Sequence, residues 1–158
     1  MESGNRDGIL HYGNGAEPQG LDPHIVTGVP ENHIVSALFE GLTAKNPYTL
    51  EPEPGVAQRW DISEDGLIYT FYLNPKARWS NGDTVTAEDF VWSWQRALSP
   101  IMGNQNAYML FPVKNAEEYA TGKLENFEQV GIEALDTHTL KITLNAPTPF
   151  FLQLLDHY

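Results

Sequence analysis

Hydrophobic and polar residues alternate with a helical period between Thr86 and Leu98. The apolar positions form a single stripe, which consists of Phe90, Val91, Trp94, Ala97 and Leu98. Such a stripe is typical of a helix that buries one face against a core. Thr86 and Asp89 are spaced as a capping box, and Ser99-Pro100 follows where the stripe ends. The pattern therefore predicts an amphipathic helix over residues 86–98, with Trp94 in the core.

Two pairs of short apolar segments predict antiparallel hairpins. Residues 58–63 and 67–73 flank an Asp-Gly turn, and residues 131–135 and 139–144 flank a second polar turn. Large side chains occupy both faces of residues 67–73, so we expect this strand to be covered on both sides. Hairpins that alternate with helices predict a mixed α/β fold of α+β character, in which helices cover one face of a sheet.

The remaining elements are predicted from capping and turn residues. A helix is expected to begin at Pro30 and to end at Gly41, which suits a C-terminal cap. Residues 46–55 contain three prolines and are expected to resist both helix and strand. A strand is expected over residues 9–14. Two shorter helices are expected, one over residues 115–121 with Gly122 as its cap and one that begins at Thr148 and Pro149.

Charge and composition restrict the classes of function. Twenty-one acidic residues against nine basic ones give a net charge of −12, which disfavours nucleic acids and anionic membranes as partners. Cysteine is absent, so disulfides, cysteine-ligated metals and thiol catalysis are excluded. No stretch approaches the roughly 20 apolar residues of a membrane span. The polar N-terminus suits either a cytosolic protein or a secreted protein whose signal peptide is absent from this sequence.

No motif for catalysis or metal binding stands out. The sequence has no GxSxG, no P-loop and no HExxH, and Gly13-Asn14-Gly15 lacks the third glycine of a dinucleotide loop. The five histidines are widely separated, so each is interpreted as a surface or hydrogen-bonded residue. We therefore expect no cofactor, no metal site and no enzymatic activity, and we favour a binding module.

Acidic pairs and tryptophans leave a second interpretation open, because glycosidases use two carboxylates and sugars stack on aromatic rings. The acidic pairs are Glu51/Glu53, Glu64/Asp65, Glu88/Asp89 and Glu117/Glu118, and the tryptophans are Trp60, Trp79, Trp92 and Trp94. Each pair also has a structural interpretation in a loop, a turn or an exposed helix, and Trp60 and Trp94 suit core packing. A carbohydrate-binding module or a glycoside hydrolase fragment therefore stays as the alternative.

Several longer motifs resemble one known family. They are LDPH at 21–24, FEGL at 39–42, GVA at 55–57 followed by Trp60, YTFYL at 69–73, WSNG at 79–82, VTAEDFVWSWQR at 85–96 and VGIEALDTHTLKITLNAPTPFF at 130–151. In this order and spacing the chain resembles the family-5 extracellular solute-binding proteins, above all the oligopeptide-binding members. The resemblance runs from about Tyr12 to the last residue.

The resemblance implies a fold and a function. Residues 1–44 would open the ligand-binding lobe of a type II periplasmic-binding-protein fold, and residues 45–158 would form a small inserted domain. The hinge and the second lobe would lie outside this chain. The implied protein is a periplasmic or otherwise extracytoplasmic receptor of an ABC importer, with or without a lipid anchor. It would be monomeric at full length, capture oligopeptides and deliver them to permease subunits. Dipeptides, nickel complexes, haem and oligosaccharides remain open as ligands.

The resemblance also implies a binding segment, which consists of Val26, Thr27, Gly28, Val29 and Pro30. In oligopeptide-binding relatives the stretch before the first helix runs alongside the peptide and bonds to its backbone. Backbone groups can pair with any peptide whatever its sequence, as in strand addition. Thr27 replaces the acidic residue of the best-known receptors, which argues against a salt bridge from this position. The alternative interpretation is a plain loop that leads into a helix.

Overall fold

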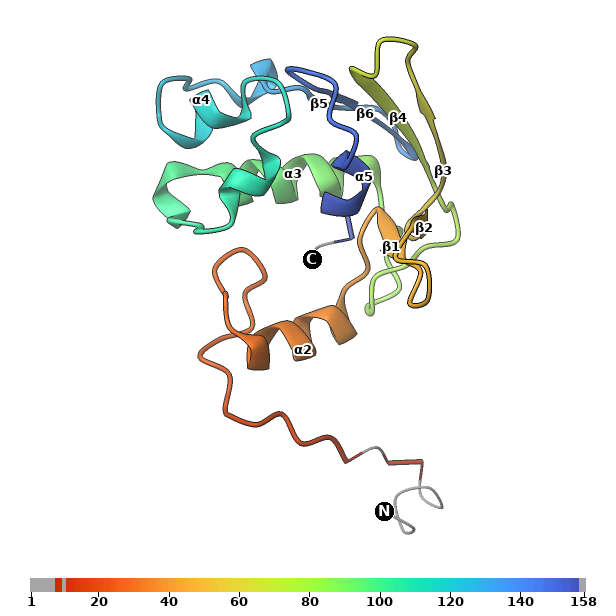
Figure 1. The fold of residues 1–158 in the computed structure, drawn as a ribbon, viewed down its shortest axis with the longest axis vertical. Coiled ribbons are helices and arrows are strands. Elements are labelled where there is room, and N and C mark those ends of the chain that lie inside the picture. Colours follow the sequence, from red (N-terminus) through yellow and green to blue (C-terminus); the bar gives the residue numbers. More distant parts are fainter. Residues whose placement is uncertain (1–7, 10, 157–158) are drawn as a thin grey trace.

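The computed structural model describes residues 8, 9 and 11–156. Its largest element is a four-stranded antiparallel sheet with the order β3-β4-β6-β5 (Figure 1). The strands are β3 (Ala57–Ile62), β4 (Ile68–Leu73), β5 (Ile132–Asp136) and β6 (Thr139–Thr143). Both predicted hairpins are confirmed. They are joined through the central pair β4–β6, in which Phe71 lies opposite Leu140 and Tyr69 opposite Ile142.

The predicted amphipathic helix is α3 (Ala87–Leu98), which lies alongside the sheet next to β5 (Figure 1). Its capping box is confirmed. The Thr86 N–H donates to Asp89 Oδ2 at 2.7 Å, and the Asp89 N–H donates to Thr86 Oγ1 at 3.3 Å. These bonds satisfy backbone donors that a helix start would leave without partners. Trp94 is half-buried and packs against the core, so it lies at the edge of the core and not in its centre.

The core lies between the sheet, α3 and a short C-terminal helix, α5 (Phe151–Leu154). Tyr69, Phe71 and Leu73 of β4 are buried, and the Tyr69 ring meets the Phe151 ring edge-on at 5.0 Å between centroids. No element within the described residues covers the opposite face of β4, so the expectation that both faces would be covered is wrong for this part of the chain. Tyr72 on that face is half-buried because its ring lies under Arg59, 3.4 Å from the guanidinium carbon, and its hydroxyl donates to Asp61.

A small antiparallel ribbon corrects the expectation for residues 46–55. β1 (Thr43–Lys45) pairs with β2 (Pro52–Pro54), although β2 contains two prolines. Prolines are tolerated there because β2 pairs with only one strand and needs no N–H on its outer side. The ribbon is fastened to the far end of the chain, since Thr43 Oγ1 donates to the Leu152 carbonyl at 2.8 Å and Lys45 pairs with Asp156 at 2.8 Å.

The first helix of the described chain is α2 (Val29–Leu38), which lies apart from the sheet (Figure 1). It ends at Leu38, so the prediction that Gly41 caps it is wrong. Gly41 is needed elsewhere, because a Cβ there would lie 2.3 Å from the Leu155 carbonyl oxygen. The expected strand over residues 9–14 is absent at Ile9 and at residues 11–14, and Leu10 lies outside the described residues.

Short helical turns complete the fold. α4 (Ala116–Ala120) is confirmed with Gly122 in the left-handed region at φ 74°, and single turns lie at Pro100–Met102, Ala107–Leu110 and Phe127–Gln129. The predicted helix at Thr148 and Pro149 begins later, at Phe151, because the Thr148 carbonyl accepts a turn bond from the Phe151 N–H. No helix within the described residues combines the length and the apolarity that crossing a membrane requires.

Candidate functional site

The predicted binding segment, residues 26–30, forms the approach to α2. Val26 is buried, Thr27 and Val29 are exposed, and Gly28 and Pro30 are half-buried. Gly28 is the residue before the helix and has an extended backbone (φ −86°, ψ 156°). Among the residues that the structure describes, the N–H groups of Thr27, Gly28 and Val29 and the carbonyls of Val26 and Thr27 have no hydrogen-bond partner. The segment thus presents backbone donors and acceptors that the fold does not use.

The end of this segment is held by Glu31 in the first turn of α2. Glu31 is only 5% exposed, and its carboxylate accepts a 2.6 Å hydrogen bond from the Gln19 N–H. A Cβ on Gly28 would lie 2.0 Å from Glu31 Oε2, so a side chain at position 28 would displace this carboxylate. Asn14 Nδ2 donates to the Pro30 carbonyl at 3.1 Å. The loop before α2 is therefore closed on itself around Glu31.

The start of the segment is held by Asp22. Its carbonyl accepts hydrogen bonds from the N–H groups of Ile25 and Val26, both at 3.1 Å. Its carboxylate accepts two bonds from Arg96 of α3, at 2.8 and 2.5 Å, and a third from the His24 N–H at 3.1 Å. Arginine presents a planar fork of donors, so this bidentate pair fixes both the distance and the orientation of the two groups.

His24 lies between Asp22 and α3. Its Nδ1 is 2.7 Å from Arg96 Nη1, and its Nε2 is 3.0 Å from Ser93 Oγ. Arginine can only donate, so His24 Nδ1 is the acceptor and Nε2 carries the proton in this arrangement. We call Asp22, His24, Ser93 and Arg96 the Arg96 network. It fastens the turn before residue 26 to the C-terminal half of α3.

The network shifts the ionisation of its members. The bidentate hydrogen bonds from Arg96 lower the pKa of Asp22 to about 2, and the same contact raises the pKa of Arg96. Burial lowers the pKa of His24, and the positive charge of Arg96 lowers it further, against the opposing effect of Asp22. At neutral pH the network therefore holds a carboxylate, a guanidinium and an uncharged imidazole.

An apolar groove of about 1050 Å³ lies between α2 and α3 and borders this network. Trp79, Trp92 and Trp94 line it together with His24 and Arg96. Of the acidic pairs considered from the sequence, only Asp89 reaches the groove, and its carboxylate is occupied by the capping box. Two free carboxylates from those pairs do not face each other here, so the arrangement lacks the geometry of a glycosidase site.

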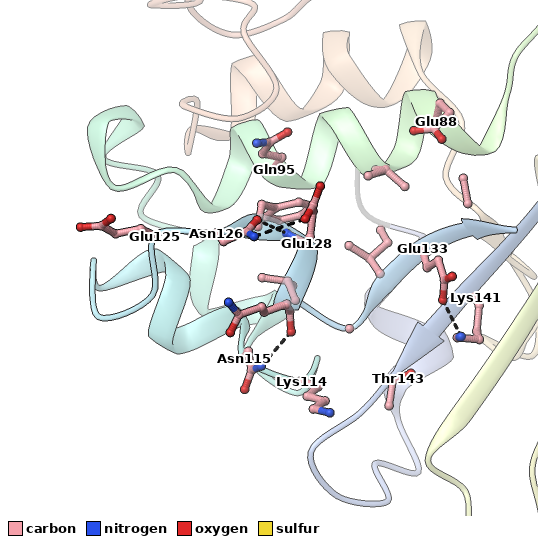
Figure 2. Close-up of a pocket in the computed structure, with 17 residues that line it drawn as sticks. Glu88, Gln95, Lys114, Asn115, Glu125, Asn126, Glu128, Glu133, Lys141 and Thr143 are labelled. Atoms are coloured by element: carbon pink, nitrogen blue, oxygen red, sulfur yellow. Dashed lines mark hydrogen bonds and ion pairs between the residues drawn. The ribbon is translucent and has the colours of Figure 1, made fainter.

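A second groove lies between α3, β5 and the loop around Asn126 (Figure 2). Some of its polar side chains are paired with near neighbours. Lys141 pairs with Glu133 at 2.5 Å, and Asn115 Nδ2 donates to the Gln129 carbonyl at 2.7 Å. Within the described residues no group of three acidic or histidine side chains is placed to hold a metal ion. Four glutamates and two lysines line this groove, so it is a polar surface channel with a net negative charge.

Residues 26–30 form the approach to α2. The sequence did not reveal the residues that fix the two ends of this segment. Asp22, Glu31 and Arg96 received no role from the sequence. The sequence held one signal for Asp22, because Asp-Pro-His at 22–24 is typical of an Asx-turn, in which the Asp side chain bonds to the backbone two residues later. The partner on α3 could not be found from local pattern, since Arg96 lies 74 positions further along the chain.

Comparison with known proteins gives a consistent result. The model of the bacterial extracellular solute-binding proteins, family 5 Middle, matches residues 51–158. The periplasmic oligopeptide-binding protein OppA of Escherichia coli K12 is 43% identical over 146 residues, which cover 91% of this chain and 26% of that protein. The chain thus spans about a quarter of the length of this relative.

Two solved structures show the same fold. The Escherichia coli murein tripeptide binding protein MppA matches with a TM-score of 0.83 and 42% identity, over 89% of this chain and 27% of that one. Haemophilus influenzae OppA in complex with RPPGFSPFR matches with a TM-score of 0.80 and 36% identity, over 90% and 29%. The predicted fold class, a mixed α/β fragment of a type II periplasmic-binding-protein lobe with antiparallel hairpins, is confirmed, and the carbohydrate-active alternative gains no support. The chain belongs to family 5 of the bacterial extracellular solute-binding proteins.

Proposed function

We propose that the chain supplies one side of an oligopeptide site in the receptor of an ABC importer, with residues 26–30 facing the ligand. The observation that carries this proposal is the row of unpaired backbone groups from Val26 to Val29, on a segment whose Thr27 and Val29 side chains are exposed. Peptide ligands offer complementary N–H and C=O groups at every residue. Pairing with them would accommodate varied sequences, because it reads the main chain and not the side chains.

The proposed division of the chain follows the core. Residues 1–44 would open the ligand-binding lobe, and residues 45–158 would form the inserted domain. The hydrophobic core runs from Leu42 to Leu155 and includes neither Val26 nor Val35, which are buried separately. A core that begins at Leu42 supports a boundary near residue 44. The hinge and the second lobe, expected outside this chain, would supply the opposite wall of the site.

The remaining features of the proposal concern the whole receptor. It would act outside the cytoplasm, as the periplasmic relatives OppA and MppA of Escherichia coli do, with or without a lipid anchor. It would be a monomer that delivers peptide to permease subunits, and it would bind its ligand without transforming it. The acidic charge of −12 would suit neither nucleic acid nor an anionic membrane surface as a partner.

A substitution at Val29 tests the backbone role directly. Val29 is the first residue of α2, where proline is well tolerated, and the extended backbone of Gly28 is compatible with a following proline. Val29→Pro therefore removes one unpaired N–H and leaves the helix intact. Val29→Ala is the matched control, because it shortens the same exposed side chain and keeps the N–H.

The measurement is calorimetry on the protein expressed from its complete gene, with a panel of di- to pentapeptides. We expect Val29→Pro to weaken the tightest peptide about tenfold, the equivalent of one lost hydrogen bond. We expect Val29→Ala to bind within about twofold of the parent, and the 158-residue chain alone to bind no peptide. Equal affinities for Val29→Pro and the parent would refute the backbone role, and no peptide binding at all would refute the receptor function.

A further inference from the structure

We propose that Arg96 of α3 is a positioning residue for the ligand-facing segment, so that the inserted domain sets where the backbone groups of Thr27 to Val29 lie. The inference rests on the proposed function of residues 26–30. It gives the inserted domain a task in ligand binding, although none of its residues needs to touch the ligand. Three features of the described structure support it.

The first feature is that the binding segment has few anchors of its own. Residues 27–29 make no backbone hydrogen bond through their N–H groups within the described chain, and Thr27 and Val29 are exposed. Its position is therefore set by its two ends. Glu31 fixes the downstream end within the same loop, through the Gln19 N–H. Asp22 fixes the upstream end, and Asp22 is held by a residue of another element.

The second feature is the directness of the upstream link. One residue, Asp22, accepts from Arg96 through its carboxylate and from Ile25 and Val26 through its carbonyl. A displacement of the Asp22 carboxylate would therefore move the turn that sets the direction of the chain at residue 26. His24 adds a second contact with α3, through Arg96 Nη1 and Ser93 Oγ.

The third feature is the rigidity of the other partner. α3 is closed at its start by the capping box, and its buried residues Ala87 and Leu98 anchor it in the core. Arg96 immediately precedes the buried pair Ala97 and Leu98. The Arg96 side chain is only 30% exposed, so it is a well-defined anchor compared with a fully solvated surface arginine.

Peptide affinity and amide hydrogen exchange, measured together, test this role. Arg96→Gln and Asp22→Asn each break the link from one side, and Arg96→Lys keeps the charge but loses the bidentate fork. Arg59→Gln is the matched control, since Arg59 is paired with Asp61 at 3.4 Å on the solvent side of β3 and is 60% exposed. All variants are made in the protein expressed from its complete gene.

We expect Arg96→Gln and Asp22→Asn each to weaken peptide binding about tenfold and to speed exchange of the Ile25 and Val26 amides, while the amides of Phe71 and Ile142 in the sheet keep their rates. Arg96→Lys should fall in between, and Arg59→Gln should match the parent. The double variant should bind no more weakly than either single variant, because both break one link.

Unchanged peptide affinity in Asp22→Asn and Arg96→Gln would overturn the inference. Slower or unchanged exchange at Ile25 and Val26 would also overturn it, even if affinity falls, because the effect would then not pass through this turn. If Val29→Pro weakens binding and the Arg96 variants do not, only this inference fails. If Val29→Pro also has no effect, the proposed function fails and takes the inference with it. If either Arg96→Gln or Asp22→Asn does not fold, the other variant alone tests the link.

Discussion

Arg96 donates to both carboxylate oxygens of Asp22, a residue 74 positions earlier in the chain, and this pair joins the loop before α2 to α3. The two side chains are about one-third exposed, so the pair is neither a solvated surface contact nor a buried ion pair. Pairs of this kind contribute more to stability than fully exposed ones, because solvent screens them less. The pair also makes stability dependent on acid.

The first prediction concerns that acid dependence. The pKa of Asp22 is lowered to about 2 in the folded chain from 3.8, so between these values the unfolded chain binds more protons than the folded chain. The contribution of Asp22 is complete above pH 4 and is lost as the pH falls towards 2. With allowance for solvent screening, we expect a loss of about 1–2 kcal/mol.

Urea unfolding of the parent and of Asp22→Asn at pH 6 and at pH 2.5 measures the contribution of Asp22 to the free energy of unfolding. The parent should lose more stability on acidification than the variant, and the difference between them should shrink at low pH. Asp61→Asn is the control, because this carboxylate is 66% exposed on β3. If the parent and Asp22→Asn respond identically to acid, Asp22 is not the group responsible.

The second prediction concerns Gly28. A methyl group at this position would meet the buried Glu31 carboxylate and displace it from the Gln19 N–H. We expect Gly28→Ala to destabilise the chain by about 1–2 kcal/mol, the usual cost of a lost hydrogen bond to a buried group. Gly13→Ala is a matched control, because nothing lies within 4 Å of a Cβ there and its φ is not positive.

Thermal unfolding of these two variants gives the comparison. Gly13→Ala should melt at or slightly above the parent, since alanine restricts the unfolded chain. The double variant Gly28→Ala with Glu31→Ala should be no less stable than Gly28→Ala alone, because the clash is gone. A melting temperature of Gly28→Ala equal to that of Gly13→Ala would show that Glu31 can move at no cost.

The third prediction compares two tryptophans on one helix. Trp94 is half-buried and packs against the core, whereas Trp92 is 64% exposed. We expect Trp94→Ala to destabilise the chain by about 2–3 kcal/mol, less than for a fully buried tryptophan. Trp92→Ala should cost less than about 0.5 kcal/mol. Denaturant unfolding measures both, and equal losses would contradict the assignment of Trp94 to the edge of the core.

The sequence predicts the locally determined elements well. The capping residues of α3 and the two hairpins were found because the signals lie within a few residues of each other, as with Thr86 and Asp89. The errors involve contacts that no local pattern reveals. Gly41 suits a helix cap by type but is required by the carbonyl of Leu155, and Pro52 and Pro54 form a strand because Thr43 and Lys45 lie opposite them. In both cases a distant partner outweighs the local propensity.

The binding segment shows the same limit. Residues 26–30 were located by resemblance, and their ligand-facing role stays a prediction. The unpaired N–H groups of Thr27 to Val29 could not be inferred from the sequence, because whether a backbone group is satisfied depends on the whole fold. Arg96 received no role for a related reason. An arginine near the C-terminal end of a helix is common, because its positive charge interacts favourably with the helix dipole.

The fastening of β1 to α5 has a consequence for how the described core holds together. Thr43 donates to the Leu152 carbonyl, 109 positions later, and Lys45 pairs with Asp156. The ribbon of β1 and β2 therefore lacks these partners until α5 is in place. We expect the ribbon and the core to unfold in one cooperative transition, and not one after the other.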